Sequence, residues 1–141
     1  LFQENKLELE CDIPNQELLF LGDGRRVYRI LENLYMNTKK YAMPGTRVYV
    51  ALQDQEEGIV FSMKNVSAAK LNITPEELTE RFVRGDSSRS TEGSGLGLSI
   101  AKSLTELMQG TFQIFLDGDL FHVEVMFPHY QEQQEEMEKE V

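Results

Sequence analysis

The sequence TEGSGLGLSI at residues 91–100 places three glycines, Gly93, Gly95 and Gly97, at the start of an apolar helical pattern. Glycine lets a backbone approach a ligand closely and adopt positive φ without strain. The first N–H groups of a helix have no partner within the helix and point outward. These features together are typical of an anion site, most often one for phosphate. A flexible loop that closes onto a helix is the alternative interpretation.

Two familiar phosphate-binding loops do not fit this stretch. A P-loop has Lys and Ser or Thr directly after its last glycine, but Leu98 and Ser99 follow Gly97. A dinucleotide-binding loop follows a strand, whereas residues 85–92 are polar and lack a strand pattern. Any residues that complete a phosphate site must therefore come from elsewhere in the chain.

A second group of candidate residues lies on a helix predicted over residues 24–41, with Asp23 as its N-cap. Its apolar stripe is expected to comprise Val27, Ile30, Leu31, Leu34, Thr38 and Tyr41. At about 100° per residue, a polar stripe lies to one side and consists of Arg26, Asn33, Asn37 and Lys40. Asn37 could offer a carbonyl oxygen and Lys40 a positive charge to one anion or metal–phosphate group. A solvated helix face is the alternative.

Composition indicates one globular domain with a substantial core, because 40% of the 141 residues are hydrophobic and 27% are charged. No apolar run approaches the roughly 18 residues of a membrane span, and no signal peptide is visible at Leu1. We therefore expect a cytoplasmic domain, excised from a parent that could be anchored in the cell membrane. The net charge of −10 disfavours nucleic acid as a partner. Residues 129–141 are interpreted as an acidic C-terminal tail.

Neither cysteine nor histidine offers an obvious reactive site. Cys11 is the only cysteine and is expected to be a small core residue in a strand over residues 7–11, facing inward with Leu7 and Leu9. One Cys and two separated His cannot assemble a metal cluster. His122 lies on the polar face of a predicted strand and His129 follows Pro128, so neither is expected to be catalytic.

The remaining patterns complete the predicted fold. Alternating or apolar runs predict further strands over residues 17–21, 46–52, 59–65, 111–116 and 120–127. Thr74, Pro75 and Glu77 form a helix-start signal, and a last helix spans about residues 96–108 with Gly110 as its left-handed cap. We therefore expect an α+β two-layer sandwich, with a mixed, mainly antiparallel sheet and helices on one face. Residues 66–92 lack a core pattern and are interpreted as a lid.

Four segments, in this order along the chain, resemble motifs of the Bergerat-fold ATPases and specifically of sensor histidine kinase catalytic domains. Gly22-Asp23 is similar to the start of the family's N-box helix, and residues 33–41 to the N box itself. Residues 80–84 are similar to its phenylalanine box and residues 93–101 to its second glycine box. The similarity extends over residues 7–127, and implies an ATP-binding catalytic domain over residues 1–128.

The resemblance implies a role for each matching residue. Asn37 would coordinate Mg²⁺, Lys40 would contact phosphate beside Asn33, and Tyr41 would line the nucleotide pocket. Arg84 and Arg89 would reach the γ-phosphate from the lid. Residues whose backbone would close on the phosphates are Gly93, Ser94, Gly95, Leu96, Gly97 and Leu98. Asn37, Lys40 and Arg84 would be the catalytic residues.

The sequence departs from the family pattern at a position that matters for hydrolysis. In hydrolases of this fold, a Glu one turn before the metal-binding Asn activates water, and this chain has Asn33 there. Glu32 is adjacent in sequence but points about 100° away on the helix. The missing base favours transfer to another group over hydrolysis, and it disfavours the related serine-kinase anti-sigma factors.

A second departure concerns the base of the nucleotide. The family's first glycine box begins with an Asp that accepts from the adenine amino group, whereas this chain has Lys64-Asn65-Val66-Ser67-Ala68, without Asp or glycine. Asn65 can still accept a hydrogen bond through its amide oxygen, without charge assistance.

The resemblance thus implies a domain that binds Mg-ATP and donates the γ-phosphoryl group to a histidine on a separate dimerisation domain, which then passes it to a response regulator. The isolated domain is expected to be monomeric. A degenerate nucleotide-binding or docking module without kinase activity is the alternative, and an ATP hydrolase is a third interpretation.

Overall fold

The computed structural model describes residues 6–13, 23–71, 74–79 and 96–129, which form five strands and three helices. Their order is β1 (Glu8–Asp12), α1 (Gly24–Tyr41), β2 (Arg47–Gln55), β3 (Gly58–Val66), α2 (Pro75–Thr79), α3 (Leu96–Leu107), β4 (Thr111–Asp117) and β5 (Leu120–Phe127). The strand predicted over residues 17–21 lies outside the described residues.

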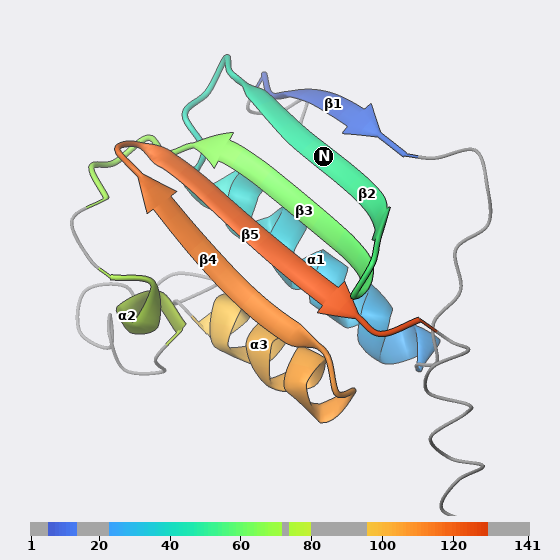
Figure 1. Ribbon diagram of the computed structural model, residues 1–141. Coiled ribbons are helices and arrows are strands. Elements are labelled where there is room, and N and C mark those ends of the chain that lie inside the picture. The colour runs from blue at the N-terminus through green and yellow to red at the C-terminus, as the bar shows by residue number, and fades with distance from the viewer. Residues whose placement is uncertain (1–5, 14–22, 72–73, 80–95, 130–141) are drawn as a thin grey trace, which may run out of the picture.

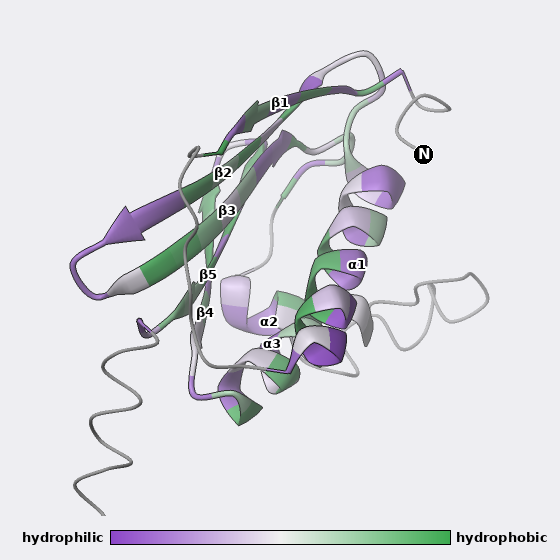
Figure 2. Ribbon diagram, turned by 90° about the vertical axis from the view of Figure 1, so that its right-hand side faces the viewer, coloured by the Kyte–Doolittle hydropathy of each residue, from purple (hydrophilic) through white to green (hydrophobic). Residues whose placement is uncertain are grey.

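The strands form one mixed sheet in the order β1-β2-β3-β5-β4, in which β1 pairs with β2 in parallel and all other pairs are antiparallel. Helices α1 and α3 lie side by side on one face of this sheet, and α2 lies beside α3 and β4 (Figures 1 and 2). The predicted α+β sandwich with helices on one face is confirmed.

Helix α1 has the predicted bounds and the predicted cap. The Asp23 side chain accepts a hydrogen bond from the Arg25 backbone N–H at 2.9 Å, and this bond lowers the pKa of the Asp23 carboxyl. Ile30, Leu34 and Thr38 are buried as expected, but Tyr41 is 39% exposed, so its place in the core stripe was wrong. The backbone becomes extended at Ala42, which pairs with Ser67, and Ala42 takes the buried position instead.

The core lies between the sheet and the two long helices. Phe121, Val123, Val125 and Phe127 of β5 are buried, as their alternation predicts, and they share the core with Val48 and Val50 of β2 and Met63 of β3. Thr38 donates a hydrogen bond to the Met63 sulfur at 3.1 Å, which joins α1 directly to β3. Leu98 and Ala101 bring α3 into the same core.

Strand β1 corrects another prediction. Leu7 is buried, but Leu9 is 40% exposed and Cys11 is exposed rather than part of the core. Both residues pair with buried positions of β2, Val48 and Val50, and therefore face the helix side of the sheet. Because β1 is an edge strand of the described sheet, these positions receive less cover than those of central strands.

The two other helices are defined by their ends. At the start of α2, the Thr74 backbone N–H donates to the Glu77 carboxylate at 2.9 Å, and the Glu77 backbone N–H donates to Thr74 Oγ1 at 3.1 Å. These two bonds are the predicted reciprocal cap. At the end of α3, Gln109 and not Gly110 adopts the left-handed conformation, with φ of 64°. Gly110 is needed for a different reason, because a methyl group there would lie 2.6 Å from the Met126 carbonyl oxygen.

Candidate functional site

The contact between α1 and α3 joins two of the motifs predicted from sequence. A methyl group at Gly97, in the first turn of α3, would lie 3.4 Å from Asn33 Oδ1 on α1. Asn33 Nδ2 donates to the Arg29 carbonyl oxygen at 2.9 Å, so the amide nitrogen is engaged within its own helix. The Asn33 oxygen is therefore the part of the side chain that lies against the start of α3.

Asn37 lies one helical turn beyond this contact. Helices α1 and α3 run in opposite directions (Figure 1), so moving along α1 from Asn33 to Asn37 leads past the first residue of α3. The N-terminal end of α3 carries unpaired N–H groups and the positive end of the helix dipole. A half-buried amide thus lies near a helix end that favours anions.

Lys40 and Tyr41 are adjacent at the last turn of α1. Lys40 is exposed, and its Nζ atom lies 5.6 Å from the centroid of the Tyr41 ring. The backbone of this turn is held to the end of β3, because Ala68 N–H donates to the Tyr41 carbonyl oxygen at 2.9 Å and Met43 N–H to that of Val66 at 2.8 Å. The C-terminal end of α1 therefore has a fixed position relative to β3.

Asn65 is the deepest polar candidate in this region. It lies on β3 with its side chain on the helix side of the sheet, and it is 3% exposed. Its Oδ1 atom is shielded from solvent and has no hydrogen-bond partner in the described part of the chain. Since an unpaired buried acceptor costs about 1–3 kcal/mol, this oxygen is suited to a donor supplied by a ligand.

Several predicted site residues are not placed by the structure. Arg84, Arg89, Gly93, Ser94 and Gly95 lie outside the described residues, and Leu96 is described only as the first residue of α3. The side chain of Leu98 is buried in the core, so only its backbone could contact a ligand.

No set of three or more His, Cys, Asp or Glu in the described segments is arranged to hold a metal ion. A Mg²⁺ ion held by Asn37 would take its remaining ligands from phosphate oxygens of the bound nucleotide and from water. Mg²⁺ is commonly bound in this way, through few protein groups together with substrate phosphates and water.

The structure also reveals a hollow that the sequence did not predict. It has a volume of about 620 Å³ and lies on the face of the sheet opposite the helices, where its lining includes Tyr49, Lys64, His122 and Glu124. Burial lowers the pKa of His122, while Glu124 at 3.2 Å acts in the opposite direction. Strand alternation indicated a polar face, but the neighbours on that face follow from the strand order.

Similarity to known proteins identifies the class of this fold. The catalytic domain of the histidine kinase ThkA superposes with a TM-score of 0.77 over 94% of this chain and 85% of that chain, at 19% identity. The two-layer fold is therefore that of histidine kinase catalytic domains. The sequence profile of the family described as histidine kinase-, DNA gyrase B- and HSP90-like ATPase matches residues 22–138, and the chain belongs to this family.

Two sensor proteins are similar in sequence. The sensor protein GtcS of Aneurinibacillus migulanus is 35% identical over 76% of this chain, and the sensor histidine kinase RppB of Synechocystis is 29% identical over 84% of it. The chain spans 29% of the length of GtcS and 27% of that of RppB. Within the described residues, no helix combines the length and apolar character needed to cross a membrane.

Proposed function

We propose that this chain is the cytoplasmic catalytic domain of a two-component sensor kinase, which binds Mg-ATP and presents the γ-phosphoryl group to a histidine on a separate dimerisation domain. A response regulator would receive the group from that histidine. The parent protein would be anchored in the membrane. The contact between Asn33 and Gly97 carries the proposal, because it joins the polar stripe of α1 to the first turn of α3.

The residues present fit a nucleoside triphosphate. Asn37 offers an oxygen to Mg²⁺, Lys40 offers a positive charge, and the backbone at Gly97 and Leu98 offers N–H groups to phosphate oxygens. Tyr41 and the unpaired oxygen of Asn65 lie at the C-terminal end of α1, beyond the contact of Asn33 with α3, and the base would bind there. Arg84 and Arg89 would approach from the lid. Phosphoryl transfer requires mainly positioning and charge neutralisation, and bound Mg²⁺ contributes to the latter.

The same residues argue against hydrolysis. Asn33 occupies the position one turn before Asn37, and an amide cannot take a proton from water near neutral pH. Glu32 is exposed and lies on a different side of α1. The domain should therefore hold ATP without turning it over until an acceptor is supplied.

A docking module that binds nucleotide weakly or not at all is the second candidate. It is favoured by one observation, the absence of both Asp and glycine from residues 64–68.

Titration calorimetry separates the two candidates. We expect the chain to bind Mg-ATP, and Asn37→Ala to weaken this binding about tenfold or more, equivalent to about 1.4 kcal/mol, while affinity for ATP in EDTA changes little. Glu32→Gln is the matched control on the same helix and should bind as the unaltered chain does. Absence of heat at millimolar Mg-ATP would favour the docking module, and an Asn37→Ala variant with full affinity would remove the assigned metal role.

A further inference from the structure

We propose that Asn65 makes the base end of this site accept both amino-purine and oxo-purine nucleotides. The inference rests on the proposed function, since it concerns the base of the same bound nucleoside triphosphate. It goes further by stating the range of bases that this residue admits.

The position of Asn65 follows from its neighbours. Across the sheet it pairs with Phe121 of β5, which is buried, and two residues earlier Met63 receives the hydrogen bond from Thr38 of α1. Two residues later, Ser67 pairs with Ala42, just after the end of α1. Asn65 is therefore enclosed between the central strands and the last turn of α1.

The length of α1 places Asn65 at a suitable distance from the proposed phosphate site. Asn33 abuts the start of α3, and Ala42 abuts the end of β3. Nine residues at about 1.5 Å each separate these two contacts by about 13 Å along α1. A partly extended nucleoside triphosphate has a similar length, so phosphates at the start of α3, beside Asn33, would leave the base near Asn65.

The chemistry of the carboxamide explains the broad selectivity. Adenine presents an amino donor at position 6 and an acceptor at position 1, whereas hypoxanthine presents an oxygen acceptor and an N–H donor at these positions. A carboxamide has an acceptor at one end and donors at the other, so a half-turn of its terminal torsion matches it to either edge. A carboxylate only accepts, and it would repel the oxygen at position 6.

The structure also favours exchange between the two orientations. No partner for Oδ1 exists in the described part of the chain, so no hydrogen bond to this oxygen opposes the half-turn. A donor from either base would satisfy an acceptor that is otherwise buried and unpaired.

The test compares Mg-ATP with Mg-ITP by titration calorimetry, because the two nucleotides differ only at ring positions 1 and 6. We expect dissociation constants within about tenfold of each other for the unaltered chain. In Asn65→Asp the constant for Mg-ITP should rise at least about tenfold relative to that for Mg-ATP. Asn65→Ala should weaken the binding of both nucleotides by a similar factor. This variant provides the test if the buried charge of Asn65→Asp prevents folding. Asn37→Ala is the control, because it should weaken the binding of both nucleotides equally through their phosphates.

The outcomes separate this inference from the proposed function. If Mg-ATP binds and Mg-ITP binds more than about tenfold more weakly, the inference is wrong and the proposed function stands. If Asn65→Ala keeps both affinities, or a folded Asn65→Asp keeps their ratio, Asn65 does not read the base. If neither nucleotide binds, the proposed function itself is overturned.

Discussion

At the residue scale, two polar side chains lie on opposite faces of the same sheet. Asn65 faces the helices, whereas His122 on the adjacent strand β5 faces away from them, with its side chain 19% exposed. Lys64 of β3 and Phe115 of β4 are its cross-strand neighbours, and the rings of Phe115 and His122 lie 5.2 Å apart. Alternation along β5 predicted the face of His122, but its neighbours depend on the pairing of strands.

This environment predicts a pH dependence of stability. Burial lowers the pKa of His122 from its usual 6.5, Lys64 acts in the same direction, and Glu124 opposes them. The unfolded chain therefore binds a proton at His122 more readily than the folded chain does. The contribution of neutral His122 to the free energy of unfolding is fully present above about pH 6.5 and declines as the pH falls below it.

Urea unfolding at a series of pH values between 7.5 and 5 measures the effect. We expect His122→Gln to show a smaller loss of unfolding free energy over this range than the unaltered chain. Lys64→Gln is a matched control on the neighbouring strand, in which the loss should shrink only slightly. Identical pH profiles for His122→Gln and the unaltered chain would contradict the prediction.

At the element scale, the end of α3 illustrates how a local signal can be assigned to the wrong residue. Gly110 N–H donates to the Thr105 carbonyl oxygen at 2.9 Å, and Gln109 N–H to that of Glu106 at 3.0 Å. These two bonds define a Schellman cap in which Gln109 takes the left-handed position. The glycine follows one residue later because Met126 and Phe127 of β5 leave no space for a side chain.

Two adjacent substitutions should therefore have opposite effects. Gln109→Gly removes the strain of a side chain at φ of 64° and should raise the unfolding free energy by about 1 kcal/mol. Gly110→Ala should lower it by about 1–3 kcal/mol, since a methyl group would lie 2.8 Å from the Phe127 ring. Chemical denaturation of both variants measures the difference, and a gain in stability from Gly110→Ala would refute this account of the cap.

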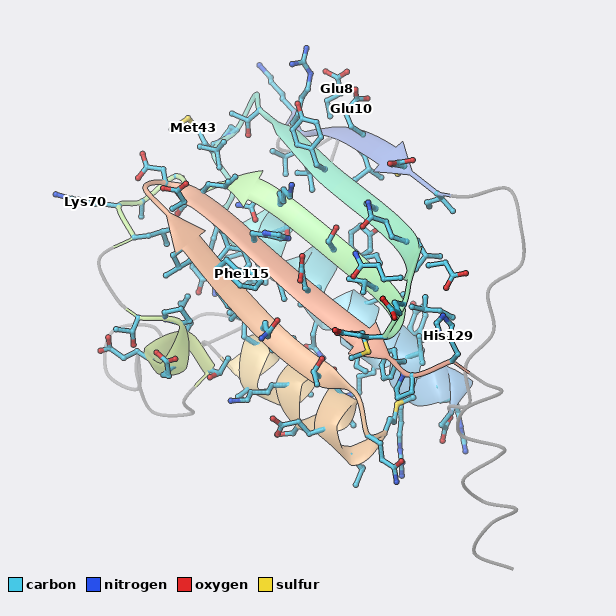
Figure 3. All side chains as sticks on the ribbon, viewed as in Figure 1. Glu8, Glu10, Met43, Lys70, Phe115 and His129 are labelled. Carbon is cyan, nitrogen blue, oxygen red and sulfur yellow. The ribbon has the colours of Figure 1, made fainter. Side chains whose placement is uncertain are left out.

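At the scale of the whole molecule, both histidines are held in positions unsuited to accept a phosphoryl group. His122 is half-buried on a strand. His129 follows the end of β5 (Figure 3), and its Nε2 atom lies 2.5 Å from Asp54 Oδ1 of β2. The proposed site lies on the other side of the sheet from His122. In the proposed function, the acceptor histidine would therefore come from another domain.

This arrangement predicts that the chain alone does not phosphorylate itself. Incubated with Mg²⁺ and ATP labelled at the γ-phosphate, it should take up no acid-labile label, whereas addition of the dimerisation domain of its parent should give label on that domain only. Light scattering of the isolated chain should give the mass of a monomer. Label mapped to His122 or His129, and lost in the matching His→Gln variant, would contradict the prediction.

The sequence by itself determined the elements that obey short-range rules. The bounds and N-cap of α1, the reciprocal cap of α2 and the buried alternation of β5 all followed from residues a few positions apart. The order of four motifs, and hence the resemblance to histidine kinase catalytic domains, was equally readable, because motif recognition needs no knowledge of distance in space.

Only the tertiary structure decided which of these residues meet. Helix packing brings Asn33 close to Gly97. The order of the strands and the helices that cover them decide the burial of Asn65 and the neighbours of His122. Both join residues that are far apart in the chain. The exposure of Leu9 depends on the edge position of β1, and the exposure of Tyr41 on where α1 gives way to extended backbone. Periodicity reports the face on which a side chain lies, but burial also requires another element to cover that face.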